Sequence, residues 1–554
     1  MIASRSPAGG SFESSAMSQQ VRTLLQRAWQ AIQAGQWQAA CDAAHEATRA
    51  DAGAFDAWRM LGIAALRLGR AELALQALQR AHVLKPGDAG TALDLGGLWL
   101  DAGQPARARP LLADAAAGLP GDPRAQFRLA TAAYAQGDFE VAARGFEAAT
   151  RLQPDWVMAW NNLAAAHGRR GDYPAAIAAA RNVQALAPVE ATGHFALAAL
   201  LSNRFDRDAL GEGLRAVEEA LRLDPGMADA HRIAALLLRK LDAPARAEAH
   251  ARRALALAPD DADNVDACGE QLLLNDKPRE ATEVYAAALQ RGVDAPALRR
   301  QLGIALLQDG RAGDARQALY DALSRAPDDQ RTIAHLGVAT ADVEGGEAAG
   351  ALLGVQRHVH RIALPTPPGF PDAARFHAAL AGDIRRHSQQ RWEPAGLAAR
   401  QAYLSGDLLA DRTAAIVAFE QALRAAIDAF IAGCKPDPKD VFLRNIPRDY
   451  VLHVWATQAA EGGHIDTHIH EASWLSGAYY VELPPAVAGD DGTHPGWIEF
   501  GRPYPHLAPA AAALRLEQPR VGDLLLFPSY LFHRTLPYRG AGERISISFD
   551  LAAA

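Results

Sequence analysis

Three histidines near the C-terminus have the spacing of a metal site. The stretch GHIDTHIH, residues 463–470, places His468 and His470 two residues apart, and His533 follows the later apolar segment DLLLFPSYLF. In a strand, residues two apart point to the same face, so the first two imidazoles can reach one ion together. A third ligand from a distant strand would complete a set with open coordination positions, which suits iron(II). The sequence therefore predicts a metal site at His468, His470 and His533.

An arginine and a serine beyond His533 have the spacing of an anion-binding pair. Arg544 lies eleven residues after His533, across the turn YRGAGE, and Ser546 follows two residues later on the same strand face. The planar guanidinium of arginine presents parallel N–H groups that match the two oxygens of a carboxylate. On an adjacent strand, this pair would bring a carboxylate-binding group next to the metal.

Other residues leave alternatives open. His464 and Asp466 form an H-x-D pair, as in sites with two histidines and one carboxylate, and Asp466 could also act together with His468. Asp466 is therefore the alternative carboxylate ligand. His358 and His360 repeat the H-x-H spacing far upstream, and we interpret them as ordinary surface or strand residues.

Short apolar segments separated by turn residues must position these side chains. Many short strands within about 100 residues are typical of a jelly-roll or cupin-like double sheet, also called a double-stranded β-helix. Helical periodicity, as at 414–432, precedes them, so we expect an α+β domain over residues 352–554. The expected strands, bounded by glycine, proline and aspartate, are VLHVWATQ, WLSGAYYVEL, GWIEF, DLLLFP and RISISFD.

These C-terminal motifs resemble a known family of bacterial oxygenases that depend on iron(II) and 2-oxoglutarate. The similar stretches are HIHEASWLSGAYYVELP, GWIEFGRP, VGDLLLFPSYLFHRTLPY and RISISFD. The resemblance implies Fe(II) as the metal, 2-oxoglutarate as cosubstrate and O2 as oxidant. It implies that His468, His470 and His533 lie at the metal, and that Arg544 and Ser546 bind the far carboxylate of 2-oxoglutarate.

The resemblance also guides the choice of ligands. We favour His468, His470 and His533, because the H-x-H pair immediately precedes the WLSGAYYV strand, as it does in the family. If all three ligands are histidines, chemistry with 2-oxoglutarate is less secure, since iron held by three histidines also serves other dioxygenases. No catalytic residue beyond the metal ligands is expected.

The N-terminal half repeats every 34 residues. Glycines at 35, 69, 103, 137 and 171 and prolines at 86, 120, 154 and 188 keep this step, which is the tetratricopeptide period. We expect an all-α solenoid of about nine repeats over residues 21–340, behind a disordered start at 1–20. Each repeat would be an antiparallel helix pair, with glycine at its turn and proline ending its second helix. The resemblance implies that the concave surface binds a peptide or protein.

Composition limits the other partners and the compartment. The 554 residues carry a formal net charge of -8, and a protein that binds nucleic acid would need a basic face. No run reaches the ~18 apolar residues of a membrane span, so we expect no membrane and no nucleic-acid partner. The three cysteines are scattered and form no disulfide framework, which favours the cytoplasm.

The leading hypothesis is a hydroxylase of the 2-oxoglutarate-dependent class, whose substrate is a peptide or protein recruited by the repeats. One alternative is a non-catalytic scaffold in which the jelly roll is only structural. Another is a three-histidine, cupin-type dioxygenase that does not use 2-oxoglutarate.

Overall fold

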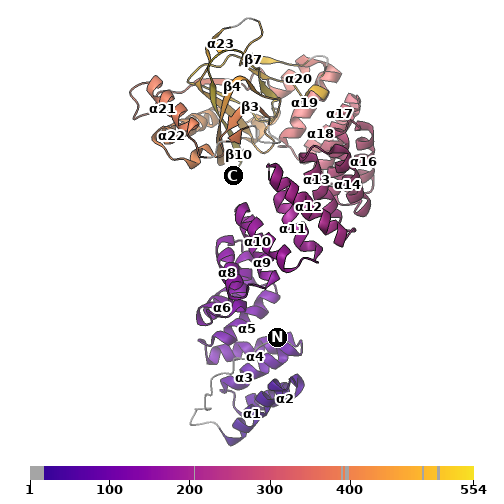
Figure 1. Cartoon of the computed structure of the whole chain (residues 1–554), viewed down its shortest axis with the longest axis vertical. Helices are drawn as coiled ribbons and strands as arrows, with labels where there is room; N and C mark the ends of the chain where they lie inside the picture. The colour runs from indigo at the N-terminus through magenta and orange to yellow at the C-terminus, as the bar shows by residue number, and fades with distance from the viewer. Residues whose placement is uncertain are drawn as a thin grey trace. The chain divides into compact units, whose positions relative to one another are not determined.

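The computed structural model describes residues 18–553 apart from 205, 389–390, 393–397, 490–491, 508 and 510–511, with the backbone alone at 391–392. Helices occupy the N-terminal part and strands the C-terminal part (Figure 1). The expected disordered start lies largely outside the described residues, and its last two residues already belong to the first helix, α1. Within the described chain, no helix is long and apolar enough to cross a membrane.

The 34-residue period gives antiparallel helix pairs, as the sequence predicts. Gly35 and Gly69 take φ angles of +70° at the turns within the first two pairs, a conformation that favours glycine. Pro86 stands two residues after α4, where it cannot continue the helix. The helices are α1 Gln19–Gln33, α2 Trp37–Ala50, α3 Phe55–Arg67, α4 Ala71–Leu84, α5 Ala89–Asp101, α6 Pro105–Gly118, α7 Pro123–Ala135, α8 Phe139–Leu152, α9 Val157–Arg169, α10 Tyr173–Leu186, α11 Ala191–Leu201, α12 Arg207–Leu223, α13 Ala228–Lys240, α14 Pro244–Leu257, α15 Ala262–Leu274, α16 Pro278–Gln290, α17 Pro296–Gln308, α18 Ala312–Arg325, α19 Gln330–Glu344 and α20 Gly346–Leu353.

Small residues let the two helices of a pair approach closely. A Cβ placed on Gly62 would lie 2.5 Å from Cγ of Leu78, and one on Gly337 would lie 2.4 Å from Cδ1 of Leu353. Both contacts are far inside van der Waals range, so glycine is required where α3 meets α4 and where α19 meets α20. The predicted all-helical solenoid is confirmed.

The chain divides into two compact units, residues 1–201 and 202–554. The second unit contains both the repeats from α12 onward and all the strands. Its hydrophobic core is continuous across that change of structure: Leu319 and Leu336 of the repeats belong to the same buried cluster as Leu475 and Leu525 of the strands. The last repeats are therefore packed as part of the β-rich region.

The strands form two antiparallel sheets. The large sheet has the order β1-β8-β5-β10-β4-β3-β2, and the small sheet has the order β7-β6-β9. The sheets agree with the predicted α+β domain, while the jelly-roll connectivity stays a prediction. The strands are β1 His360–Ala363, β2 Arg391–Trp392, β3 Ala399–Leu404, β4 Tyr450–Ile465, β5 Leu475–Glu482, β6 Ile498–Phe500, β7 Arg515–Glu517, β8 Asp523–Pro528, β9 His533–Thr535 and β10 Arg544–Ala553.

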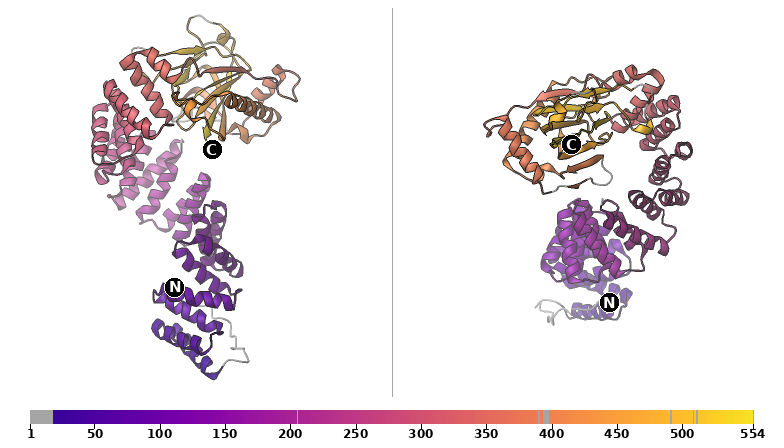
Figure 2. Two further views of the ribbon diagram at one scale, coloured as in Figure 1. Left: turned by 180° about the vertical axis from the view of Figure 1, so that it is seen from behind. Right: turned by 45° about the horizontal axis from the view of Figure 1, so that its top comes forward.

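Helices lie on both sides of these strands. In Figures 1 and 2, α21 (Ala373–Arg385) and α22 (Ala414–Gly433) lie on one side, and α19 and α20 lie on the other. Tyr479 on β5 points toward α21 and α22: its hydroxyl is 2.7 Å from Nε2 of His377, and its ring is 5.1 Å from that of Phe419. The neighbouring Tyr480 must face the opposite way, into the space between the sheets.

His358 corrects one expectation from the sequence. It is buried rather than on the surface, and its Nε2 lies 2.8 Å from Oδ2 of Asp440. The backbone N–H groups of Phe442 and Leu443 also donate to this carboxylate. This contact links the segment after α20 to the segment after α22. His358 therefore has a structural role that does not involve a metal.

We expect the shared core to decide which fragments fold. A fragment of residues 202–554 should fold cooperatively, because it keeps the whole second core. A fragment of residues 352–554 should lack a cooperative transition, because it loses Leu319 and Leu336 and exposes the surface they cover. Thermal unfolding followed by circular dichroism measures both, and cooperative melting of the shorter fragment near the temperature of the longer one would contradict the shared core.

Candidate metal centre and anion pocket

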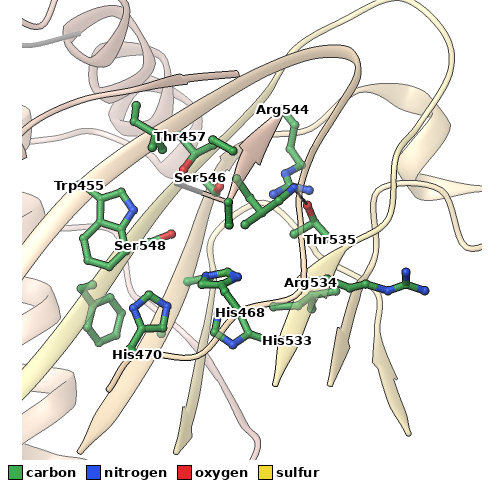
Figure 3. A pocket seen from close by; sticks show the side chains of 18 of the residues that line it. Trp455, Thr457, His468, His470, His533, Arg534, Thr535, Arg544, Ser546 and Ser548 are labelled. Carbon is green, nitrogen blue, oxygen red and sulfur yellow. Dashed lines mark hydrogen bonds between the residues drawn. The ribbon is translucent and has the colours of Figure 1, made fainter. Parts of the chain in front are cut away.

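The three predicted histidines meet in space. One nitrogen from each of His468, His470 and His533 lies within 4.8 Å of the others, in a group that could hold one ion (Figure 3). His533 begins β9, while His468 and His470 follow the end of β4 instead of lying in a strand of their own. An isolated bridge joins the two segments: the N–H of His468 donates to the carbonyl of His533, and the reverse bond also forms, both at 3.1 Å.

A hydrogen bond at Nδ1 sets the orientation of each imidazole. Nδ1 of His468 lies 2.8 Å from the Asp466 carbonyl, and Nδ1 of His533 lies 2.9 Å from the Leu531 carbonyl. Nδ1 of His470 lies 2.8 Å from the Asp550 carboxylate. These oxygens only accept, so each Nδ1 carries the proton and each Nε2 keeps its lone pair. Three Nε2 atoms are therefore available as ligands.

Burial keeps the imidazoles of His468 and His533 neutral. Burial, and to a lesser extent the neighbouring His470, lower the pKa of His468 to about 4. Burial, with the two other imidazoles, also holds the pKa of His533 well below its usual value. Only neutral imidazole binds a metal, so His468 and His533 are in the metal-binding form at pH 7 without losing a proton first.

A cavity of about 620 Å³ between the two sheets contains the three histidines. One face of β10 contributes Arg544, Ser546 and Ser548 to its wall, and β4 and β5 add Thr457 and Tyr480 beside Ser546. Polar groups therefore gather toward the Arg544 end. The apolar lining includes Leu404, Trp455, Ile465, Ile469, Ala478, Ile498, Phe527 and Phe549.

Arg544 is a buried cation with no ion-pair partner among the described residues. Only 2% of the residue is exposed, and neither Nε nor Nη1 has a hydrogen-bond acceptor among the described residues. Burial lowers the pKa of its guanidinium, which reports the cost of holding this charge away from water. Buried charges in proteins are normally paired, so an unpaired guanidinium in a cavity wall indicates an anion-binding site. Ser546, also buried, lies two residues away on the same face, as predicted.

Asp466 is not brought to the three histidines. Its carboxylate pairs with Nε of Arg400 at 2.9 Å and faces Nε2 of His464 at 3.3 Å, and its side chain is 45% exposed. The sequence reasoning instead missed Asp550, which the structure places behind His470. Asp550 follows Arg544 by six residues in the pattern R-x-S-x-S-x-D, so the two-residue period could have marked its face, although not its partner.

The last repeat touches both segments that carry the histidines. On α19, Nε of Arg331 lies 3.5 Å from the carboxylate of Glu471, the residue after His470. One turn later, the ring of His335 packs edge-on against Phe532, the residue before His533, with 5.6 Å between ring centroids. Burial lowers the pKa of His335 to about 3, so this contact is neutral. The repeats thus support the site directly.

Two families match separate parts of the chain. Residues 453–550 match the family described as "Putative 2OG-Fe(II) oxygenase". The family described as "Tetratricopeptide repeat" matches five segments that together span about half of the chain: 25–89, 93–155, 127–191, 204–262 and 272–330.

Several solved structures of tetratricopeptide-repeat proteins match part of the chain. YrrB, a tetratricopeptide-repeat protein with an unusual peptide-binding site, is 18% identical, and the match covers 35% of this chain and 98% of YrrB with a TM-score of 0.32. A thermophilic repeat protein of Thermus thermophilus is 28% identical over 34% of this chain and 100% of its own, with a TM-score of 0.28. The C-terminal part of a repeat protein of Cytophaga hutchinsonii is 15% identical over 44% of this chain and 98% of its own, with a TM-score of 0.36. No curated protein matches the chain.

The unpaired charge predicts an unusual effect on stability. Arg544→Met should leave the melting temperature of the metal-free protein unchanged or raise it by a few degrees, because methionine fills the space and removes a buried, unpaired charge. Arg361 is the matched control: it pairs with Glu517 at 2.5 Å and with Asp523, so Arg361→Met should lower the melting temperature. Equal losses in both variants, measured by thermal unfolding without iron or added carboxylate, would contradict an unpaired Arg544.

Proposed function

Because the chain belongs to the tetratricopeptide-repeat family and its residues 453–550 match the 2OG-Fe(II) oxygenase family, we propose that it is an iron(II)- and 2-oxoglutarate-dependent oxygenase. We propose further that it is a hydroxylase whose substrate is a peptide or protein held by the repeats. One observation carries the proposal: three available imidazole nitrogens and a buried guanidinium line the same cavity. Among the described residues, no carboxylate pairs with that guanidinium.

The residues fit the groups that the family implies. His468, His470 and His533 would hold iron(II), and the neutral nitrogen donors suit this metal. Arg544 would pair with the far carboxylate of 2-oxoglutarate, and the hydroxyl of Ser546 lies on the same face to donate to it. When bound, iron(II), 2-oxoglutarate and O2 supply the oxidising chemistry, which yields succinate and CO2 and adds one oxygen atom to a C–H bond of the substrate.

The chain's own contribution is orientation and exclusion of water. Arg544 lies on β10, His533 lies on β9, and His468 and His470 follow β4, so packed segments set the separation of these groups before any ligand binds. The indole of Trp455 packs 5.6 Å from the ring of His470 and lines the cavity on the side away from Arg544. This apolar side is the space that we assign to the substrate group, where bulk water would compete least.

Arg544 distinguishes this function from the alternatives. A three-histidine dioxygenase that does not use 2-oxoglutarate does not need a buried, unpaired arginine. A non-catalytic scaffold needs neither this arginine nor the three histidines. Keeping an unpaired charge in a core costs several kcal/mol. A ligand carboxylate offsets that cost, which gives the residue a reason to be there.

The repeats supply the proposed recruitment. Tetratricopeptide repeats generally bind proteins or peptides on a concave surface, and five segments of this chain match that family. We keep the proposal at the level of a polypeptide substrate, since the repeats specify no particular partner.

Titration of purified protein with iron(II) and 2-oxoglutarate under anaerobic conditions tests the cosubstrate site. The wild type should develop the weak visible charge-transfer band of an iron–2-oxoglutarate complex. His533→Ala should lose the band through loss of the metal. Arg544→Met should bind iron as before but need at least tenfold more 2-oxoglutarate, since one charge-assisted pair contributes ~1.5–3 kcal/mol. If folded, iron-loaded wild-type protein develops no charge-transfer band with 2-oxoglutarate, the proposal is wrong.

Removal of the first compact unit tests recruitment. The fragment 202–554 keeps the cavity and its supporting repeats, so succinate formation without substrate should be unchanged. Its Michaelis constant for a polypeptide substrate should rise, because the contacts made by residues 1–201 are lost. Steady-state kinetics with both proteins measure this, and equal Michaelis constants would mean that the first unit does not recruit substrate.

A further inference from the structure

A closed set of hydrogen bonds holds Asp550 behind His470. One carboxylate oxygen of Asp550 lies 2.8 Å from Nδ1 of His470, and the other accepts a bond of 2.6 Å from the hydroxyl of Ser476. That hydroxyl lies 2.8 Å from the hydroxyl of Ser529, whose carbonyl accepts the backbone N–H of His470 at 3.1 Å. Ser476 and Ser529 are 1% and 0% exposed. His470 is thus held at both its backbone and its ring.

Among the described residues, Asp550 has no basic side chain beside it other than His470. No arginine or lysine in that part of the chain pairs with this carboxylate, and its donors are the hydroxyl of Ser476 and Nδ1 of His470. Its side chain is only 14% exposed. A largely buried negative charge without an arginine or lysine beside it favours a positive charge nearby. The imidazole of His470 lies between that charge and the place where the three Nε2 atoms converge.

The composition of the ligand set makes this charge matter. Three neutral imidazoles contribute no charge, whereas two imidazoles and a carboxylate contribute one negative charge. A divalent ion held by three histidines therefore leaves a centre one unit more positive than the usual arrangement. The negative charge of Asp550, next to His470, balances that additional positive charge. Its hydrogen bond to Nδ1 also makes the imidazole of His470 a more basic ligand.

We propose that Asp550 is the carboxylate of this metal centre, acting through His470 as a positioning and charge-balancing residue that lets three histidines bind iron(II) like a two-histidine, one-carboxylate set. The identity of the metal rests on the proposed function. Asp466, the carboxylate that the sequence suggests, does not serve this purpose, because its charge already pairs with Arg400 on the solvent side.

One strand links this role to the anion pocket. Asp550 and Arg544 lie on the same face of β10, with Ser546 and Ser548 between them. Asp550 contributes a negative charge at the metal end of the cavity, and Arg544 contributes a positive charge at the other end. A ligand that bridges the metal and Arg544 therefore enters a site whose two ends carry opposite fixed charges.

Iron(II) affinity of the full-length protein tests the proposal without reference to turnover. The dissociation constant is measured anaerobically by competition with a coloured chelator. Asp550→Asn, which keeps the shape and removes the charge, should raise it ~10- to 100-fold, the usual effect of losing such a partner. Asp550→Glu should recover part of the loss, and Ser476→Ala should give a smaller rise, because Asp550 keeps its charge but loses one donor.

A second histidine–aspartate pair, more deeply buried than His470 and Asp550, provides the matched control. His358 and Asp440 are also 2.8 Å apart and buried, but they lie outside the cavity. Asp440→Asn should lower the melting temperature while changing the iron(II) dissociation constant less than about twofold, since distant sites act independently. A similar rise in Asp440→Asn and Asp550→Asn would reduce Asp550 to a general structural role and overturn the proposal.

Two further outcomes are decisive. A wild-type dissociation constant in Asp550→Asn, or a larger rise in Asp466→Asn, would overturn the assignment of the carboxylate. Wild type that binds iron(II) but forms no band with 2-oxoglutarate would reject the proposed function, and the comparison of Asp550→Asn with wild type would still decide the role of Asp550.

Discussion

The alternation of side chains along β10 is the constraint on which the site depends. Because neighbouring residues in a strand face opposite ways, Arg544, Ser546, Ser548 and Asp550 share one face, while Ile545 and Ile547 are buried in the hydrophobic core. A shift of register by one residue would turn the polar row into the core and the apolar row toward the cavity. The same packing energy that holds the strand in the sheet therefore holds the guanidinium and the carboxylate at the two ends of the cavity.

The buried polar groups around the cavity differ in how they are satisfied. The imidazoles have their Nδ1 partners, and Asp550 has a histidine and a serine, so that half of the site is complete before a ligand arrives. Arg544 has no acceptor at Nε or Nη1 among the described residues. A folded protein can keep such a group only at a cost in stability, and ligand binding is the event that offsets it. The pocket is thus preorganised for an anion.

The boundary between repeats and strands also has consequences for function. The composition changes after α20, yet the hydrophobic core runs through that point, and α19 contacts the residues next to His470 and His533. The last repeat is part of the scaffold of the metal centre as well as part of the array. A change in the packing of α19 would therefore be transmitted to His470 through Glu471 and to His533 through Phe532.

The amino-acid sequence by itself determined the features that depend on near neighbours along the chain. The 34-residue step of glycines and prolines predicts helix pairs because turns and helix ends are local, and the H-x-H and R-x-S spacings predict shared faces because strand geometry is local. Most of the solenoid and the residue types of the candidate site could be read in this way. The sequence predicts an ordinary surface or strand residue at His358, because no local pattern indicates its contact with Asp440, more than 80 residues later.

Only the tertiary structure decided which distant residues meet. Asp466 lies two residues from His468 and yet turns to Arg400, while Asp550, eighty residues after His470, lies against its ring. That outcome follows from the strand order β5-β10-β4, which brings Ser476 beside Asp550 and Tyr480 beside Ser546. The periodicity of a strand reports which way its residues face, but the identity of its neighbour depends on the packing energy of the whole sheet, which no local pattern contains.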